Sequence, residues 1–220
     1  MERTSREVAN YYDTVLIATT NKGKLSELRE IFSIQNIRVL GLDEFCDYTE
    51  PEETGEMFCE NALIKARAAA KYAGLVSVAD DSGLIVDALN GAPGVYSARY
   101  ASDIPSFEGE SMDARNIRKL LANLKNVDLS KRTAKFHCCI AVASPFGEDM
   151  LSEGDWHGEI LFEPRGKNGF GYDPVFYDSD LKKTAAELLP EEKNAISHRS
   201  KALRGLMIKW EEFWSKAKLH

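Results

Sequence analysis

The chain has 220 residues, of which 44% are hydrophobic and 29% are charged, a composition typical of a folded globular protein. This length suits one sizeable α/β domain or two small ones. The formal net charge of -7 at pH 7 makes duplex nucleic acid a poor partner, because binding it requires a basic surface. The same charge is compatible with one small nucleotide held in a locally basic site.

Residues 1–13 are polar and predict a flexible extension without the apolar core of a signal peptide. No later stretch is long enough to span a bilayer, so we expect a cytoplasmic protein with no membrane partner. The cysteines show no C-x-x-C spacing, and we expect buried or idle thiols in a reducing compartment and no structural metal. They are Cys46, Cys59, Cys138 and Cys139.

The first third of the chain alternates predicted strands and helices. Residues 14–19 form a β-branched run typical of a buried strand, and apolar side chains at helical spacing predict a helix over 22–33. A second strand is predicted at 37–41. A strongly acidic loop covers 43–56, and the Ala-rich segment 57–73 predicts a helix.

The middle of the chain begins with a short predicted strand at 75–79, which we expect to end in the polar sequence 80–83. Residues 84–89 are predicted to be extended again, and the Gly- and Pro-containing segment 90–94 predicts a turn. An amphipathic helix is predicted over 113–124.

The last third predicts a long strand at 132–143, two further strands at 150–155 and 159–162, and a Gly-rich loop at 166–173. A long helix is predicted from Ile196 onward. Its apolar stripe, which we expect to be core, consists of Leu203, Leu206, Met207, Trp210, Phe213 and Trp214. Strands alternating with helices predict an α/β domain with a mixed sheet.

The turn from Thr19 to Lys24 is a candidate phosphate site. Backbone N–H groups in a turn that enters a helix hold anions, and Lys24 adds a positive charge. The segment lacks the upstream glycine and the final Ser/Thr of a Walker A loop. An ordinary helix start capped by Thr20 or Asn21 explains it at least as well.

Two acidic pairs are candidates for metal binding. Asp80-Asp81 follows a buried strand, and adjacent carboxylates repel unless a cation or a donor lies between them. Glu52-Glu53 lies in the acidic loop, where a solvated charge run is the commoner explanation. Mg²⁺ takes oxygen ligands, so one of these glutamates could complete a site with Asp81.

Two later segments are candidates for recognising a base. The sequence 169–174 places an aromatic between glycines, so Phe170 or Tyr172 could stack on a purine and Asp173 could accept from a ring N–H. A Gly-rich hairpin with a core aromatic explains it equally well. Further on, Lys193 and the triplet 197–199 gather donors near a predicted helix start, where a solvated basic turn is also common.

Taken together, these segments resemble the inosine triphosphate pyrophosphatase family, also called XTP/dITP diphosphatases. They occur in the family's order and cover most of residues 14–207. The matching stretches are ATTNKGKLSEL, EETGEMFCENALIKARAAA, ADDSGLIVDALNGAPGVYSARY, GKNGFGYDPVF and KTAAELLPEEKNAISHRSKAL.

The resemblance implies one catalytic domain over residues 14–217 with a two-lobed α/β fold, related to the Maf/Ham group. In this fold a twisted mixed sheet is flanked by helices around a central cleft. It also implies a homodimer and a Mg²⁺-dependent reaction. That reaction converts ITP, dITP or XTP into the monophosphate and pyrophosphate, which removes deaminated purines from the nucleotide pool.

Site roles follow from the resemblance position by position. Asp81 corresponds to the general base and, with Glu53, to the metal ligands, while Glu52 and Asp80 support them. The residues expected to bind substrate are Thr19, Thr20, Asn21, Lys22, Gly23, Lys24, Ser82, Phe170, Gly171, Tyr172, Asp173, Lys193, His198 and Arg199. Thr20 replaces a glycine found in many members, which affects the expected phosphate-loop geometry.

Two rival functions remain open at this point. A Maf-like pyrophosphatase acting on pyrimidine or modified nucleotides is disfavoured by the GFGYD and SHR sequences. A regulatory module that binds nucleotides without turnover is disfavoured because Lys24, Glu53, Asp80 and Asp81 are all present.

Overall fold

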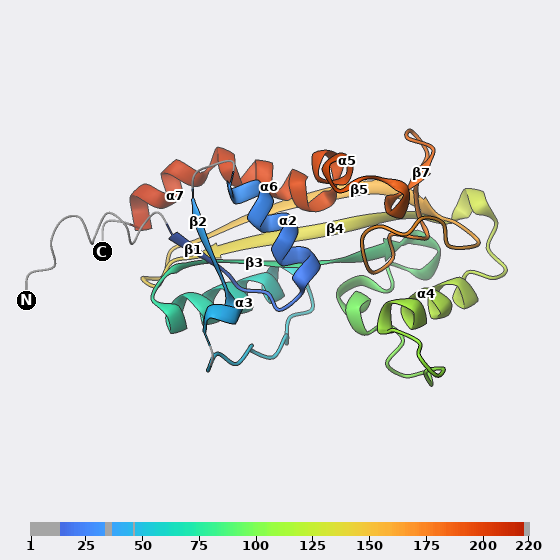
Figure 1. Cartoon of the computed structure of the whole chain (residues 1–220), viewed down its shortest axis with the longest axis horizontal. Coiled ribbons are helices and arrows are strands. Elements are labelled where there is room, and N and C mark those ends of the chain that lie inside the picture. Colours follow the sequence, from blue (N-terminus) through green and yellow to red (C-terminus); the bar gives the residue numbers. More distant parts are fainter. Residues whose placement is uncertain (1–13, 34–36, 46, 218–220) are drawn as a thin grey trace, which may run out of the picture. The chain divides into compact units, whose positions relative to one another are not determined.

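The computed structural model describes residues 14–33, 37–45 and 47–217, which fall into two compact units (Figure 1). Unit 1 is drawn from the ranges Met1–Asp81, Cys139–Glu153 and Ala202–His220, and unit 2 from Ser82–Cys138 and Gly154–Lys201. The prediction for residues 1–13 lies outside the described residues. No described helix combines the length and the apolar character that crossing a bilayer requires.

The described strands form one mixed sheet in the order β2-β1-β3-β4-β5-β6-β7. Parallel pairing joins β1 to both β2 and β3, whereas β6 pairs antiparallel with β5 and β7. This confirms the predicted mixed sheet. The strands are β1 Thr14–Ile17, β2 Arg38–Gly41, β3 Val76–Val86, β4 Thr133–Ala143, β5 Asp149–Ile160, β6 Phe176–Asp178 and β7 Lys183–Thr184.

All the predicted helical segments contain helix, with one difference at the C-terminal end. The α-helices are α2 Lys22–Ser33, α3 Phe58–Ala73, α4 Met112–Asn123, α5 Pro190–Ile196, α6 His198–Ile208 and α7 Trp210–Ala217. The expected single long helix from Ile196 is wrong, because the chain turns at Lys209 between α6 and α7. Ser197, which is extended with φ -61° and ψ 158°, separates α5 from α6.

The predicted break at residues 80–83 is also wrong, because β3 runs without interruption from Val76 to Val86. Asp80 and Asp81 lie in the middle of this strand, not at its end. Sequence context favoured a turn, but the segment is extended within a strand that lies between β1 and β4 in the sheet. The parallel pairing with β1 joins Val76, Ser77 and Val78, just before the two aspartates. Both carboxylates are therefore carried by a strand of the sheet.

Residues 150–155 and 159–162, predicted as two strands, belong mainly to the single strand β5. Gly158 lies inside β5, where it allows the neighbouring strand β6 to approach closely, and it does not interrupt β5. A Cβ at this position would lie 2.5 Å from the backbone oxygen of Tyr177 in β6, so only glycine fits.

The core of unit 1 lies on both faces of its strands. Alternate β4 residues Cys139, Ala141 and Ala143 pack with the alanines of α3. Figure 1 shows α3 on one face of these strands and α7 on the other. Phe32 of α2 contacts Trp210 with ring centroids 5.7 Å apart, which confirms that the terminal aromatic stripe is core.

Unit 2 has a separate core, built largely from aromatic residues and α4. Phe136 of β4 contacts Phe176 of β6 at a ring-centroid distance of 4.3 Å, and Trp156 of β5 packs against the same Phe176 ring. Leu120 of α4 is fully buried in this cluster. This core supports the segments that the sequence analysis proposed for recognising a base.

The expectation of idle thiols is wrong for two cysteines. Cys59 and Cys139 form a disulfide across 80 residues of sequence, with their Cα atoms 5.2 Å apart. Cys138 is buried and lies outside this bond. Cys46 lies outside the described residues.

Candidate functional site

The turn before α2 caps the start of that helix. The Asn21 side-chain oxygen accepts hydrogen bonds from the backbone N–H groups of Gly23 (2.9 Å) and Lys24 (3.1 Å). Thr19 accepts from the Asn21 N–H at 3.2 Å. Capping by Asn21, one of the two explanations of this segment, is confirmed. Thr20 is exposed and donates to Glu50 at 3.2 Å.

An acidic cluster lies beside this turn in unit 1. The Lys24 ammonium is 3.1 Å from a carboxylate oxygen of Asp80, whose side chain is fully buried. The Lys65 ammonium lies 2.8 Å from Glu53 and 3.3 Å from Asp81, and so joins these two carboxylates. The structure thus brings together Lys24, Glu53, Asp80 and Asp81 of the predicted site, around Lys65.

Asn61 fixes the cluster from α3. This fully buried side chain donates to Asp81 at 3.3 Å and to the Gly55 backbone oxygen at 3.2 Å, and it accepts from the Gly55 N–H at 2.8 Å. One amide therefore connects the acidic loop to the β3 carboxylate. Asn61 and Lys65 are four residues apart on α3, which places both side chains on one helix face.

Burial raises the pKa of the Asp81 carboxyl, and the ammonium groups of Lys65 and Lys24 offset this only in part. The neighbouring carboxylates of Glu53 and Asp80 raise it further. For Lys65, burial works against the charged form, but the carboxylates around it outweigh burial and raise its pKa. The cluster therefore favours the charged form of Lys65 and contains one carboxylate, that of Asp81, which ionises less readily than usual.

The two glutamates of the acidic loop differ in position. Glu53 is half-buried and paired with Lys65, whereas Glu52 is exposed. Sequence reasoning did not assign Asn61 or Lys65 a role. The available signal was their spacing on one face of a helix that directly follows the acidic loop.

A second cluster, in unit 2, surrounds Phe170. A carboxylate oxygen of the buried Asp173 accepts from the Phe170 N–H at 2.9 Å and from the Lys193 ammonium at 2.7 Å. The Lys193 nitrogen also lies 4.7 Å from the centre of the Phe170 ring. Asp173 was expected to accept from a base, but here its carboxylate holds the loop and Lys193.

Arg199 lies in the same cluster. Its guanidinium donates to the Ser82 hydroxyl at 3.0 Å, and its central carbon is 5.9 Å from the centre of the Phe170 ring. His198 is buried and stacks on Phe136 with ring centroids 5.0 Å apart. The structure therefore brings Phe170, Lys193 and Arg199 of the predicted base-recognition group together around a half-buried aromatic ring, and Ser82 joins them through Arg199.

The remaining loop residues have structural contacts. Tyr172 is buried in the core and donates to the backbone oxygen of Ser97 at 2.8 Å, and burial raises the pKa of its phenol. Of the two candidate stacking rings, Tyr172 is therefore occupied in packing and Phe170 is the more accessible. The Gly171 N–H donates to Asp113 at 2.8 Å, a contact that the sequence did not indicate.

Gly169 adopts a positive φ of 75°, and a Cβ on it would lie 1.9 Å from the Asp173 carboxylate. Glycine is required here for both conformation and space. The loop geometry thus depends on the same carboxylate that holds Lys193.

Comparison with known proteins gives the family of the chain. Residues 15–209 match the model of the Ham1 family. The chain belongs to the Ham1 family. It is 51% identical over 201 residues to a dITP/XTP pyrophosphatase of Nitratidesulfovibrio vulgaris, covering 91% of this chain and 97% of that protein. A dITP/XTP pyrophosphatase of Geobacillus kaustophilus is 50% identical over 198 residues, with 90% and 94% covered.

A solved structure supports the fold as well. The HAM1 protein of Coxiella burnetii aligns with a TM-score of 0.79 and 47% sequence identity, covering 90% of this chain and 98% of that one. The α/β fold with a mixed sheet is therefore shared with solved members of the family.

Proposed function

We propose that this Ham1-family chain hydrolyses deaminated purine nucleoside triphosphates, namely ITP, dITP and XTP, to the monophosphate and pyrophosphate. The observation that carries the proposal is the buried cluster of Asp81, Glu53 and Lys65, supported by relatives named dITP/XTP pyrophosphatases. Such a cluster suits attack of water on a polyanionic phosphate chain.

We propose Mg²⁺ as the cofactor, held by Glu53 and Asp81 and supported by Asp80 and Glu52. The donor set fits this ion, because all four side chains offer carboxylate oxygens. Three carboxylates, of Glu53, Asp80 and Asp81, lie in this cluster with the ammonium groups of Lys24 and Lys65. When bound, Mg²⁺ neutralises phosphate oxygens and stabilises the pyrophosphate leaving group.

The chain's own residues have separate tasks in the proposed reaction. Asp81 takes a proton from the attacking water, a task that needs its ionised form. Lys24 lies at the first turn of α2 and adds positive charge for the phosphates. Residues 19–23 would contact the same phosphates, with Asn21 already fixing the helix start.

Base selection is proposed for the Phe170 cluster. Stacking of a purine on Phe170 contributes about 1–3 kcal/mol. The donors of Lys193, His198 and Arg199 suit the O6 carbonyl of hypoxanthine or xanthine. Adenine presents an amino group there and leaves buried donors without an acceptor, which discriminates by on the order of 10⁴-fold.

A homodimer working in the cytoplasm is also proposed, on the family resemblance alone. Analytical ultracentrifugation tests the dimer. If the protein sedimented as a 24.6 kDa monomer at all protein concentrations, this result would contradict the proposed dimer.

A nucleotide panel with and without Mg²⁺ tests the function. We expect pyrophosphate release from ITP, dITP and XTP, slow release from ATP and GTP, and no turnover after chelation. Separate assays of pyrophosphate and orthophosphate locate the cleaved bond. Orthophosphate as the first product, or ATP hydrolysed as fast as ITP, would contradict the proposal.

A further inference from the structure

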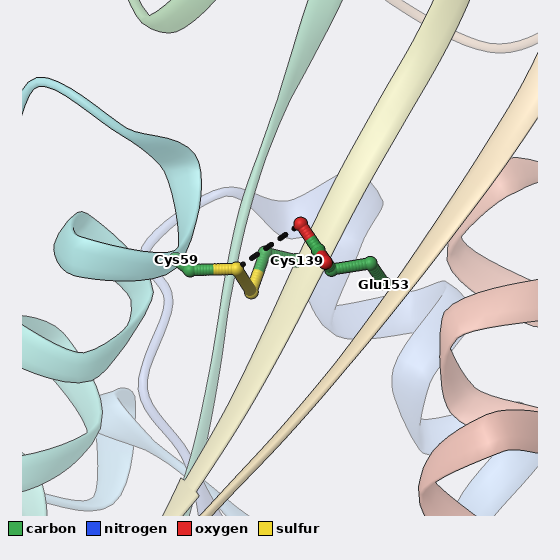
Figure 2. A group of neighbouring side chains, drawn as sticks. All are labelled: Cys59, Cys139 and Glu153. Carbon is green, nitrogen blue, oxygen red and sulfur yellow. Dashed lines mark hydrogen bonds between the residues drawn. A yellow bond between two sulfur atoms is a disulfide. The ribbon is translucent and has the colours of Figure 1, made fainter.

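One side-chain group in unit 1 has no part in the proposed reaction. Figure 2 shows Cys59 of α3 joined to Cys139 of β4, with the Glu153 carboxylate of β5 beside the two sulfurs. The potential ligand atoms of these three residues all lie within 4.8 Å of one another. The three residues are well separated in sequence, so the fold itself brings them together.

The two sulfurs differ in accessibility. Cys59 is half-buried in the first turn of α3, whereas Cys139 is fully buried among the alanines of the unit 1 core. A thiol or disulfide from solution therefore reaches the sulfur of Cys59 and not that of Cys139.

Glu153 affects the stability of the reduced cysteine pair. Its carboxylate oxygen lies 3.3 Å from the Cys59 sulfur. An oxidised sulfur carries no proton, so this contact becomes a hydrogen bond only when Cys59 is a thiol. Glu153 therefore stabilises the reduced pair relative to the disulfide, which makes the bond easier to reduce.

We propose that Cys59 and Cys139 form a reversible thiol–disulfide exchange site for small-molecule disulfides, and that its oxidation ties α3 to β4. The Cys59 thiolate attacks a disulfide RSSR, forming a Cys59–SR bond and releasing RS⁻. The Cys139 thiolate then attacks the Cys59 sulfur, forming the internal bond and releasing a second RS⁻. The two cysteine protons go to the released thiolates, so the protein is oxidised by two electrons and RSSR is reduced to two RSH.

Oxidation affects the helix that supports the candidate site. Asn61 and Lys65 follow Cys59 on α3, and both contact Asp81. The importance of these contacts for turnover rests on the proposed function. The bond closes a long loop, and such bonds stabilise the folded state mainly by restricting the unfolded chain. Oxidation thus stabilises α3 and its contacts without adding a catalytic group.

The test uses the full chain in a Cys46→Ser background, equilibrated with mixtures of reduced and oxidised glutathione. Mass mapping after alkylation gives the oxidised fraction, and thermal melting gives the midpoint Tm. We expect reversible formation of the Cys59–Cys139 bond and a Tm on the order of 10 °C higher for the oxidised protein. Hydrogen exchange in the first two turns of α3 should slow in parallel.

Variants separate the bond from other effects. Cys59→Ser should abolish the redox dependence of Tm, whereas Cys138→Ala should retain it. Glu153→Ala should reduce the equilibrium constant for reduction by about twofold to tenfold, the effect of one lost hydrogen bond, and Glu163→Gln should not. Because Cys59 is half-buried, its serine variant should fold even if a change at Cys139 does not.

Three outcomes would overturn the proposal: an equal Tm for both redox states, a disulfide that maps to other cysteines, or a reduced pair that binds Zn²⁺ tightly and resists oxidation. None of these measurements uses a nucleotide. A failure of the exchange site is therefore distinguishable from a failure of the proposed hydrolysis.

Discussion

The two buried clusters of this molecule are built from the same residue types but carry opposite charge imbalances. In unit 1, three carboxylates (Glu53, Asp80 and Asp81) face two ammonium groups (Lys24 and Lys65), a formal excess of one negative charge. In unit 2, the single carboxylate of Asp173 accompanies Lys193 and Arg199, a formal excess of one positive charge.

The difference indicates what each cluster is suited to bind. The carboxylate oxygens of the unit 1 cluster suit a divalent cation, and the N–H donors of the unit 2 cluster suit a carbonyl acceptor. The following predictions test this contrast.

The largest effect is expected from Asp81→Asn. Loss of the proposed base should reduce kcat for ITP by about 10²–10⁴-fold, the usual contribution of general base catalysis. Initial-rate assays of pyrophosphate release provide the measurement, and Asp128→Asn, at an exposed acid, is the control. A variant that keeps a tenth of the wild-type rate would remove Asp81 from the mechanism.

The same variant tests the raised pKa of Asp81 through stability. The pKa of Asp81 is raised in the folded state, so its contribution to stability is fully present below its unfolded pKa near 3.8 and is lost as pH rises through the folded pKa. The free energy of unfolding of Asp81→Asn relative to wild type should therefore increase as pH rises above about 4. Chemical denaturation at pH 4 and pH 8 measures this change, and a constant difference would contradict the raised pKa.

In unit 2, Lys193→Met should break the buried pair with Asp173. Removing one partner of such a pair costs about 3–5 kcal/mol of folding stability, because the other charge stays buried. We also expect a higher KM for ITP, since Lys193 contacts the Phe170 ring. Denaturant unfolding and steady-state kinetics measure the two effects.

The double variant Lys193→Met/Asp173→Asn serves as the control. Neutralising both partners should recover part of the lost stability, because no isolated charge remains. If the double variant were less stable by the full sum of the two single losses, the two side chains would not be coupled. The contrast between the clusters would then rest on unit 1 alone.

Asn61→Ala should have an intermediate effect. It removes the side-chain partner of the half-buried backbone groups of Gly55, at a cost of about 1–3 kcal/mol. It also removes a donor to Asp81, which should raise the pKa of that carboxyl and move the acid limb of the kcat/KM profile to higher pH. Loss of a supporting hydrogen bond of this kind costs about 10–100-fold in activity.

Asn116 offers a matched control in unit 2. Like Asn61, it is buried and its side chain makes three hydrogen bonds. It accepts from the Ala101 N–H and donates to the backbone oxygens of Ser97 and Ala98. Asn116→Ala should lose similar stability without moving the pH profile. An equal pH shift in both variants would mean that Asn61 acts only through general stability.

The helices of the first part of the chain could be predicted closely because their apolar residues follow the helical period. α2, for example, begins at Lys22 and ends at Ser33 as predicted. The predicted strand break at residues 80–83 was wrong because Asp-Ser-Gly has local turn character. Pairing with neighbouring strands overrides such local preferences, and single-sequence reasoning contains no information about that pairing.

The site shows the same limit. Lys24, Glu53 and Asp81 were identifiable as candidates from their chemistry and from the family resemblance. Asn61 and Lys65 were not, because they lie on an Ala-rich helix that reads as core and their contacts to Asp81 span 20 and 16 residues of sequence. The Cys59–Cys139 bond spans 80 residues and depends entirely on how α3 packs against β4.

A half-buried ion pair gives the smallest predicted effect and is the comparison for the buried clusters. Glu110 accepts two charged hydrogen bonds from Arg118, at 2.7 and 2.9 Å, which lower the pKa of its carboxyl to about 2. A lowered pKa means that the stabilisation is present above the unfolded value near 4.5 and is lost as pH falls toward 2.

Glu110→Gln should therefore lower Tm by no more than about 2 °C at pH 7, and by less in 1 M salt, because solvent and ions screen the pair. Melting curves at two salt concentrations measure this, with the exposed neighbour Glu108→Gln as the control. A loss as large as that of Lys193→Met would show that burial does not set the strength of these pairs. The charge contrast between the two clusters would then lose its physical basis.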